Sequence, residues 1–92
     1  MIKDFADKDA ENFWLTGISA LPPDLRKRAY RKLQQLHAAK TLDFLRVPPG
    51  NELEKLIGDR KGFYSIRINR RWRICFKWDN GNVSSVEIVD YH

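Results

Sequence analysis

The last three residues of the chain, Asp90, Tyr91 and His92, bring together a carboxylate, a phenol and an imidazole. Histidine has a reference pKa of about 6.5, so it can give or take a proton near neutral pH. Asp90 is a candidate base, or a partner that orients the imidazole, and Tyr91 is a candidate to stack on a nucleobase or donate a hydrogen bond. A terminal histidine taken alone is more often simply exposed, so the residues beside it decide its role.

Basic side chains gather in one stretch of the sequence. Residues 60–78 hold seven basic residues and no acidic one, namely Arg60, Lys61, Arg67, Arg70, Arg71, Arg73 and Lys77. The whole chain has 17 Lys and Arg against 12 Asp and Glu, a net charge of +5. Such clustering is typical of a protein that binds a polyanion, although a solvated basic surface without a partner would look the same by charge alone.

Arginines and a histidine together suit RNA cleavage that needs no metal ion. The 2′-hydroxyl loses a proton and attacks the phosphorus, charge builds on the non-bridging oxygens, and the 5′ oxygen leaves. A guanidinium binds phosphate oxygens bidentately and stays charged at working pH. The sequence has no Walker loop, no HExxH motif and no metal-spaced cysteine set, which disfavours a metal-dependent nuclease. Its single cysteine, Cys75, excludes an internal disulfide and is interpreted as structural.

The N-terminal part of the chain predicts a short strand and a helix. Residues 2–5 alternate as a strand would. Asp7 or Asp9 is expected to cap a helix that reaches about Thr16, and Gly17 is a plausible end to it.

A second helix is predicted to open at Pro22 and Pro23 and to fade near Lys40. One apolar stripe runs along it, formed by Leu25, Ala29, Leu33 and Leu36. Residues 41–51, with a Pro-Pro-Gly-Asn run, are expected to form a loop.

The second half of the chain reads as strands over residues 63–69, 72–78 and 83–91, after a weak strand candidate at 52–57. Asn80-Gly81 predicts a tight hairpin turn, because both residues tolerate positive φ. In the strand 72–78, one set of side chains faces the core, namely Trp72, Ile74, Phe76 and Trp78.

Short connections between these strands predict where the candidate site residues meet. Strands 63–69 and 72–78 are joined only by Arg70-Arg71, so they should pair antiparallel with Arg67 and Arg73 close together on the face away from the core. Strand 83–91 runs back along 72–78 and should bring residues 90–92 close to Arg73. The expected fold is α+β, with two N-terminal helices packed on one face of a twisted, mainly antiparallel sheet.

Length and composition fit one globular domain over residues 1–92. Hydrophobic residues make up 42% of the chain and charged residues 32%. No apolar run approaches the ~20 residues of a transmembrane helix, and the N-terminus lacks an apolar signal segment. A cytoplasmic location and no membrane contact are therefore expected.

Several motifs together resemble the RelE superfamily of bacterial toxins, and within it the HigB-type branch. They are Pro-Pro-Gly-Asn-Glu-Leu-Glu-Lys-Leu (48–56), Gly-Asp-Arg-Lys-Gly-Phe-Tyr-Ser-Ile-Arg-Ile-Asn (58–69), Trp-Arg-Ile-Cys-Phe (72–76) and Val-Glu-Ile-Val-Asp-Tyr-His (86–92). No single motif is specific, but the resemblance extends over nearly the whole chain.

The resemblance implies a toxin of a type II toxin–antitoxin pair, with a fold like that of microbial ribonucleases and no cofactor. Such toxins cleave mRNA in the ribosomal A site and are neutralised by a HigA-type helix-turn-helix antitoxin; the free toxin is expected to be monomeric. The family's functional positions fall on Arg73, Asp90, Tyr91 and His92, with Arg67 and Lys55 as weaker matches.

One position departs from the family pattern. Some HigB-type toxins have a catalytic histidine just before the Gly-Asp-Arg segment, and the nearest equivalent here is Glu54. A glutamate can still accept a proton, so Glu54 joins the catalytic candidates. The residues expected to bind RNA are Lys55, Arg60, Lys61, Arg67, Arg70, Arg71 and Lys77.

Two other functions remain open from the sequence. The ParE branch of the same superfamily inhibits DNA gyrase and does not need an Asp-Tyr-His end. A plain RNA- or ribosome-binding module would bind through the basic stretch with steep salt dependence and leave mRNA intact.

Overall fold

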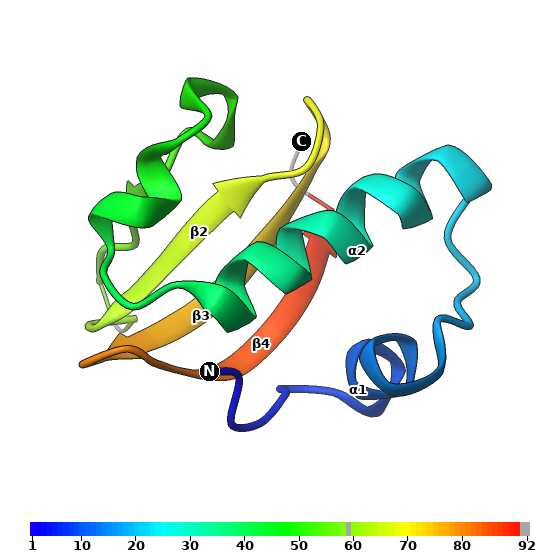
Figure 1. Cartoon of the computed structure of the whole chain (residues 1–92), viewed down its shortest axis with the longest axis horizontal. Coiled ribbons are helices and arrows are strands. Elements are labelled where there is room, and N and C mark those ends of the chain that lie inside the picture. Colours follow the sequence, from blue (N-terminus) through cyan, green and yellow to red (C-terminus); the bar gives the residue numbers. More distant parts are fainter. Residues whose placement is uncertain (59, 91–92) are drawn as a thin grey trace.

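The computed structural model describes residues 1–58 and 60–90 as two helices and one four-stranded sheet (Figure 1). In chain order the elements are α1 (Lys8–Thr16), α2 (Pro23–Ala38), the short 3₁₀ helices η1 (Asp43–Arg46) and η2 (Pro49–Asn51), and the strands β1 (Glu54–Lys55), β2 (Phe63–Arg67), β3 (Trp72–Asp79) and β4 (Asn82–Asp90). None of the helices in this described part is long and apolar enough to cross a membrane.

Both ends of α1 are set by local chemistry. Of the two aspartates proposed as its cap, Asp7 is the one used, because its carboxylate accepts a hydrogen bond of 2.7 Å from the backbone N–H of Ala10. Gly17 ends the helix in the left-handed conformation with φ of 77°, where a residue without Cβ is favoured. The predicted bounds of this helix are confirmed.

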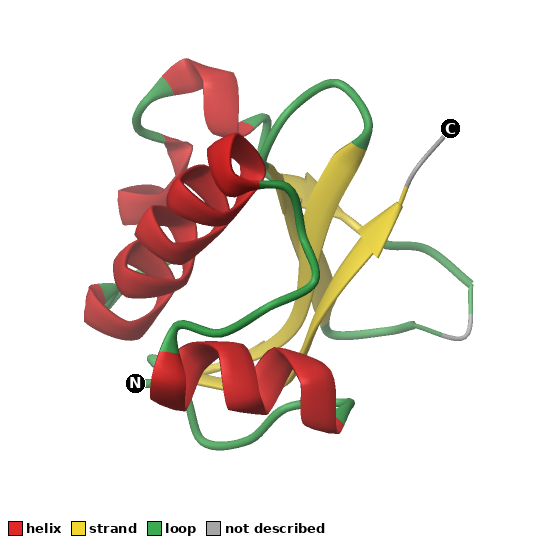
Figure 2. Cartoon of the chain, turned by 90° about the vertical axis from the view of Figure 1, so that its right-hand side faces the viewer, coloured by secondary structure: helices red, strands yellow, loops and turns green. Residues whose placement is uncertain are grey.

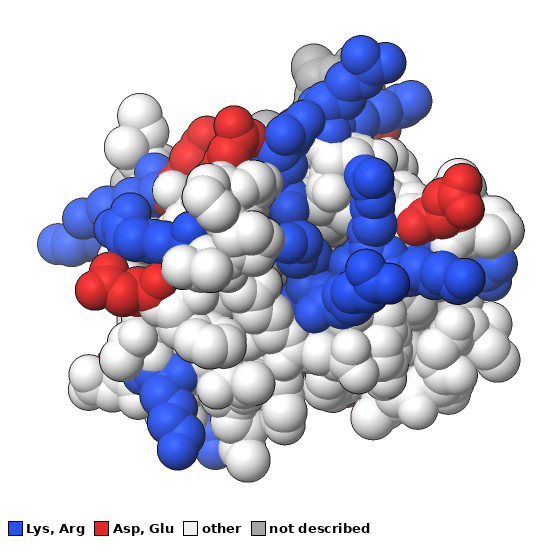
Figure 3. All heavy atoms as spheres, turned by 45° about the horizontal axis from the view of Figure 1, so that its top comes forward, with Lys and Arg blue, Asp and Glu red and all other residues white. Residues whose placement is uncertain are grey.

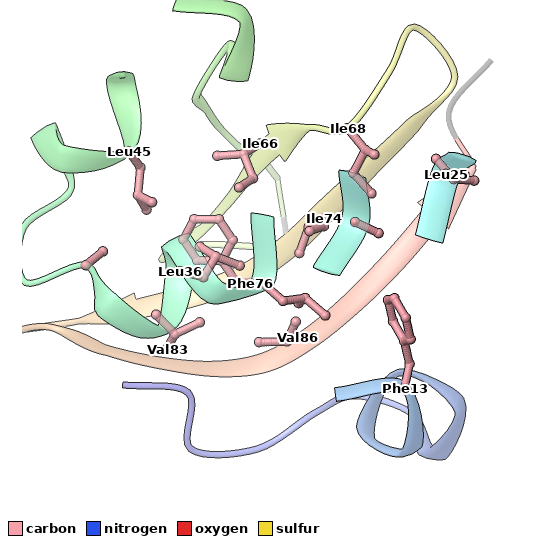
Figure 4. Close-up of a cluster of buried hydrophobic side chains, with 13 residues drawn as sticks. Phe13, Leu25, Leu36, Leu45, Ile66, Ile68, Ile74, Phe76, Val83 and Val86 are labelled. Atoms are coloured by element: carbon pink, nitrogen blue, oxygen red, sulfur yellow. The ribbon is translucent and has the colours of Figure 1, made fainter. Parts of the chain in front are cut away.

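The apolar stripe of α2 faces the sheet as predicted. Its four members, Leu25, Ala29, Leu33 and Leu36, are all buried. The sheet meets them with Ile66, Ile74, Phe76, Val83 and Val86 (Figure 4). Burying each of the larger side chains stabilises the fold by about 1.5–3 kcal/mol, so this layer holds the helix on the sheet.

The strands follow the order β1-β2-β3-β4, and each pairs antiparallel with the next. Figure 2 shows both long helices on the same side of the sheet, which confirms the α+β prediction. The Asn80-Gly81 turn has positive φ at both residues, 49° and 87°. Residues 2–5 lie parallel to β4 through bridges from Ile2 to Val83 and from Phe5 to Val86.

Three features differ from the sequence-based expectation. β2 ends at Arg67, and residues 68–71 form the turn, where the Asn69 side chain accepts hydrogen bonds from the backbone N–H groups of Arg71 and Trp72. The expected strand at 52–57 shrinks to Glu54–Lys55. The expected loop 41–51 contains η1 and η2.

Buried Asn51 explains why this loop is ordered. Its amide donates to Gln35 Oε1 and to the backbone oxygens of Leu45 and Val47, while its Oδ1 accepts from the Lys32 ammonium. A buried amide with all these partners ties the loop to α2.

Candidate active site

Arg67 and Arg73 lie directly opposite each other on β2 and β3. Their neighbours Ile66 and Ile74 are buried against the helices, and side chains alternate along a strand, so the two arginines share the face away from the helices. This placement confirms the predicted pairing. We call this surface the open face.

Arg73 is far more buried than the alternation predicts, with only 7% of the residue exposed. Its Nε donates to Ser65 Oγ at 2.8 Å, and its Nη2 donates to the backbone oxygens of Glu52 and Ser65 at 2.5 and 3.3 Å. These contacts fix the guanidinium plane and leave Nη1 turned toward the open face.

Two carboxylates stand beside the exposed edge of this guanidinium. Glu52 Oε2 lies 3.9 Å from Arg73 Nη1 and 3.5 Å from Arg67 Nε, and Glu54 Oε1 lies 4.0 Å from Arg73 Nη1. Both carboxylates are more than half exposed, so they are accessible to a ligand. The cluster of two arginines and two glutamates places phosphate-binding and proton-accepting groups side by side.

The end of β4 lies beside the start of β3, as predicted, with Asp90 opposite Trp72 and Val89 opposite Arg73. The carboxylate of Asp90, however, binds Arg71: Nε donates at 2.9 and 3.1 Å and Nη2 at 2.8 Å. This hydrogen bond, and then the charge of Asp90, raise the pKa of Arg71. The other two residues of the tail, Tyr91 and His92, lie outside the described residues.

The remaining basic candidates do not form one surface. Arg60 pairs with Glu87 at 2.9 Å and lies 4.8 Å from the centre of the Phe63 ring. Lys61, Arg70 and Lys77 are exposed. Lys55 pairs with Tyr64, which packs on the core, so Lys55 lies on the helix side of the sheet. The clustering of these residues in sequence therefore overstates their clustering in space.

The helix contributes basic residues that lie outside the basic stretch 60–78 of the sequence. Arg28, Arg31 and Lys32 of α2 border a groove whose other wall includes Arg67, Pro48 and Gly50. The i, i+3, i+4 spacing of these three residues was visible in the sequence and signals one face of a helix.

Among the described residues, no group of three His, Cys, Asp or Glu side chains is placed to hold a metal ion. His37 accepts a hydrogen bond from the Ile2 backbone N–H at 3.2 Å and packs on Trp14, so it holds α2 against the N-terminal residues.

Known proteins match both the fold and the sequence. The fold resembles that of the toxin–antitoxin complex YoeB-YefM from Staphylococcus aureus, with a TM-score of 0.61 and 20% identity over the whole chain and 95% of that chain. The fold and the sequence together define a RelE-like toxin. The chain belongs to the family of RelE-like HigB toxins of type II toxin–antitoxin systems, which matches residues 3–92.

Two curated relatives agree with this family. Toxin HigB-1 of Vibrio cholerae serotype O1 is 39% identical over 83 residues, which is 88% of this chain and 87% of the relative. Endoribonuclease HigB of Proteus vulgaris is 32% identical over 93 residues, the full length of both chains. The resemblance proposed from the sequence motifs is thereby confirmed.

Proposed function

We propose that this HigB-like toxin is an endoribonuclease that cuts mRNA on the ribosome and so inhibits translation. The observation that carries the proposal is the contact between Arg73 and Glu54 on the open face, at 4.0 Å. It is supported by the relative from Proteus vulgaris, whose name states endoribonuclease activity.

In the proposed reaction, Arg73 Nη1 and Arg67 bind the non-bridging oxygens of the scissile phosphate, which takes the place of the Glu52 carboxylate beside them. Because Ser65 and the Glu52 backbone oxygen already hold the Arg73 guanidinium, it needs little reorganisation when charge develops on the phosphate.

Glu54 is assigned the role of base. It takes the proton from the 2′-hydroxyl, and the 2′ oxygen then forms a bond to phosphorus while the bond from phosphorus to the 5′ oxygen breaks. His92 is assigned the role of acid, because an imidazolium can protonate the leaving 5′ oxygen near neutral pH. The products are a 2′,3′-cyclic phosphate and a 5′-hydroxyl end.

The rest of the C-terminal tail has a supporting part in this scheme. Asp90, held by Arg71, anchors the end of β4 beside β3, and Tyr91 contacts a nucleobase next to the cleaved bond. The exposed basic residues Lys55, Arg60, Lys61, Arg70 and Lys77 contribute electrostatic attraction to RNA.

The proposed partners follow from the family and the activity. The ribosome and its mRNA would place the toxin in the cytoplasm, and a HigA-type helix-turn-helix protein would act as antitoxin to a free toxin that is monomeric. The antitoxin is supported by the type II family and by the related fold of YoeB, which was solved in complex with YefM.

Primer extension on mRNA from a translating extract tests the proposal. Adding the protein should produce new 5′ ends, and the same mRNA without ribosomes should show fewer of them. If translating mRNA gains no new ends while the protein blocks DNA supercoiling by gyrase, the toxin acts as a gyrase inhibitor and the proposal fails.

A further inference from the structure

We propose that the groove between α2 and the end of β2 binds the phosphates of an RNA strand that continues from the active site. The inference rests on the proposed function and adds to it a second contact region on the helix side of the molecule. It is called the α2 groove here, and its basic residues are Arg28, Arg31, Lys32, Arg67 and Arg70.

The α2 groove has the shape of an open channel with a volume of about 510 Å³ in its larger section. Arg28, Arg31 and Lys32 line one wall, and Gly50 and Pro48 line the other. Arg28 and Arg31 stand one helical turn apart, which separates their Cβ atoms by about 5–6 Å and lets them contact successive phosphates.

Of the charges in this groove, only that of Arg67 is paired with a carboxylate among the described residues, Glu52 at 3.5 Å. The side chains of Arg28, Arg31 and Arg70 make no ion pair or hydrogen bond with any residue of the described part of the chain, whereas Arg73 and Arg71 each have a carboxylate within 4.0 Å. Figure 3 shows Lys and Arg side chains gathered in a band on one face of the molecule.

The positive charges of Arg28 and Arg31 also affect the pKa of Lys32. Burial, and then the charges of Arg28 and Arg31, lower its pKa. Its ammonium keeps one neutral partner, Asn51 Oδ1. Asp24 does not line the groove and borders a neighbouring hollow together with Lys27. A ligand that carries several negative charges would relieve this repulsion, as a phosphate chain does.

Arg67 connects the α2 groove to the active site. The residue borders the groove, while its Nε, on the open face, lies 3.5 Å from the Glu52 carboxylate, which in turn lies 3.9 Å from Arg73 Nη1. A strand whose scissile phosphate sits at Arg73 can therefore pass over Arg67 into the groove. The RNA is either the flank of the cleaved mRNA or a ribosomal RNA segment, since both offer the same phosphates.

Two variants test the inference without touching Arg73 or Glu54. Arg28→Gln with Arg31→Gln removes two charges. Gly50→Asp adds a carboxylate to the facing wall, where a new Cβ meets no atom within 4 Å. The matched control is Lys8→Gln with Lys40→Gln, which removes two exposed charges that do not line the groove.

Binding is measured as a function of salt to two probes: a single-stranded RNA with 2′-O-methyl groups throughout, which lacks the attacking hydroxyl, and purified ribosomes. Losing two phosphate contacts should reduce the slope of log affinity against log salt by about 1.4 and weaken binding about tenfold or more at 0.1 M salt. Gly50→Asp should also weaken binding, and the control Lys8→Gln with Lys40→Gln should affect binding much less.

The two probes separate the sources of the RNA. Loss of binding to the oligonucleotide identifies the mRNA flank, and loss confined to ribosomes identifies ribosomal RNA. If both groove variants bind both probes as the parent does, the inference is overturned, and it is equally overturned if they lose affinity only for the antitoxin protein. Because the oligonucleotide cannot be cut, this result is independent of whether the parent cleaves mRNA.

Discussion

Arg73 combines a structural role in the sheet with the proposed role in binding phosphate, and its position in the sequence indicates only the second. Alternation along β3 predicts a surface charge, but the side chain is buried and bonded to Ser65 and to the backbone oxygen of Glu52. Any change at this residue should therefore affect stability as well as the proposed binding of phosphate, and a test of the proposed catalytic role must measure both.

Replacing Arg73 should reduce both quantities. Arg73→Lys keeps the charge but loses the planar guanidinium with its several N–H donors. The acceptors on Ser65 and Glu52 then lose partners, which should lower the free energy of unfolding by about 1–3 kcal/mol. The rate of mRNA cleavage by Arg73→Ala, measured by primer extension, should fall about 10²–10³-fold under conditions where the variant is folded.

Urea unfolding and primer extension check these values, and Arg46→Lys, in an exposed pair with Asp43, is the control that should change neither. Parental cleavage by folded Arg73→Ala would refute the assignment of Arg73.

Glu54 can be tested by restoring the residue type of some relatives. Glu54→Gln should slow single-turnover cleavage about 10²–10⁴-fold because the amide cannot accept the proton. Glu54→His should recover activity and move the acid limb of the pH–rate profile to higher pH, because imidazole is more basic than a carboxylate and must be neutral to act as base. An unchanged rate for Glu54→Gln would assign the base to another residue.

In the proposed reaction, Glu52 competes with the substrate phosphate for Arg67 and Arg73. Glu52→Gln should therefore tighten binding of the uncleavable RNA about two- to fivefold, since an exposed ion pair contributes about 0–1 kcal/mol. The backbone oxygen that holds Arg73 is retained in this variant. Weaker binding would show that the Glu52 side chain supports the site instead of screening it.

At the level of elements, the segment η1–η2 links the two surfaces proposed to bind RNA, the open face and the α2 groove. Asn51, held by Lys32 and Gln35 of α2, ends η2, and the next residue, Glu52, takes the left-handed conformation with φ of 43°. This turn directs the Glu52 backbone oxygen to Arg73. The order of one loop thereby supports both a wall of the α2 groove and the guanidinium of the active site.

Removing the Asn51 amide should loosen this link. Asn51→Ala removes a donor from the buried backbone oxygen of Leu45 and from the partly buried oxygen of Val47, and should lower the free energy of unfolding by about 1–3 kcal/mol. Hydrogen exchange should quicken most over residues 43–55. The exposed Asn12→Ala is a suitable control, and equal exchange in both variants would contradict the role of Asn51.

The elements show where sequence reasoning was sufficient. The stripe of α2, the alternation of β3 and the Asn-Gly turn are local patterns, and they placed Arg67 opposite Arg73 correctly. The burial of Arg73 was not predictable in this way, because its partner Glu52 is 21 residues earlier in the chain. The α2 groove was missed for the same reason: it depends on how a helix crosses a distant strand.

For the whole molecule, charge is distributed unevenly around one core. Residues 1–21 carry four acidic and two basic side chains. The α2 groove, in contrast, is bordered by Arg28, Arg31, Lys32 and Arg67, and the last of these connects it to the open face. Attraction to RNA should therefore orient the toxin as well as bind it, with the groove and the open face toward the strand.

The reactivity of the Cys75 thiol should measure how much of the protein is in an open state. The thiol is fully buried at the middle of β3, between β2 and β4, so a reagent reaches it only when the sheet comes apart. The rate of alkylation should follow the population of the globally open state, increase with urea, and slow in proportion as saturating RNA stabilises the folded form.

An exposed cysteine introduced at residue 82 in a chain without Cys75 provides the reference for immediate reaction. Equal rates in the two proteins would mean that the sheet opens locally. Since the chain has no other thiol, the modified fraction read by mass spectrometry follows the population of the open state, even in a crude extract that contains ribosomes.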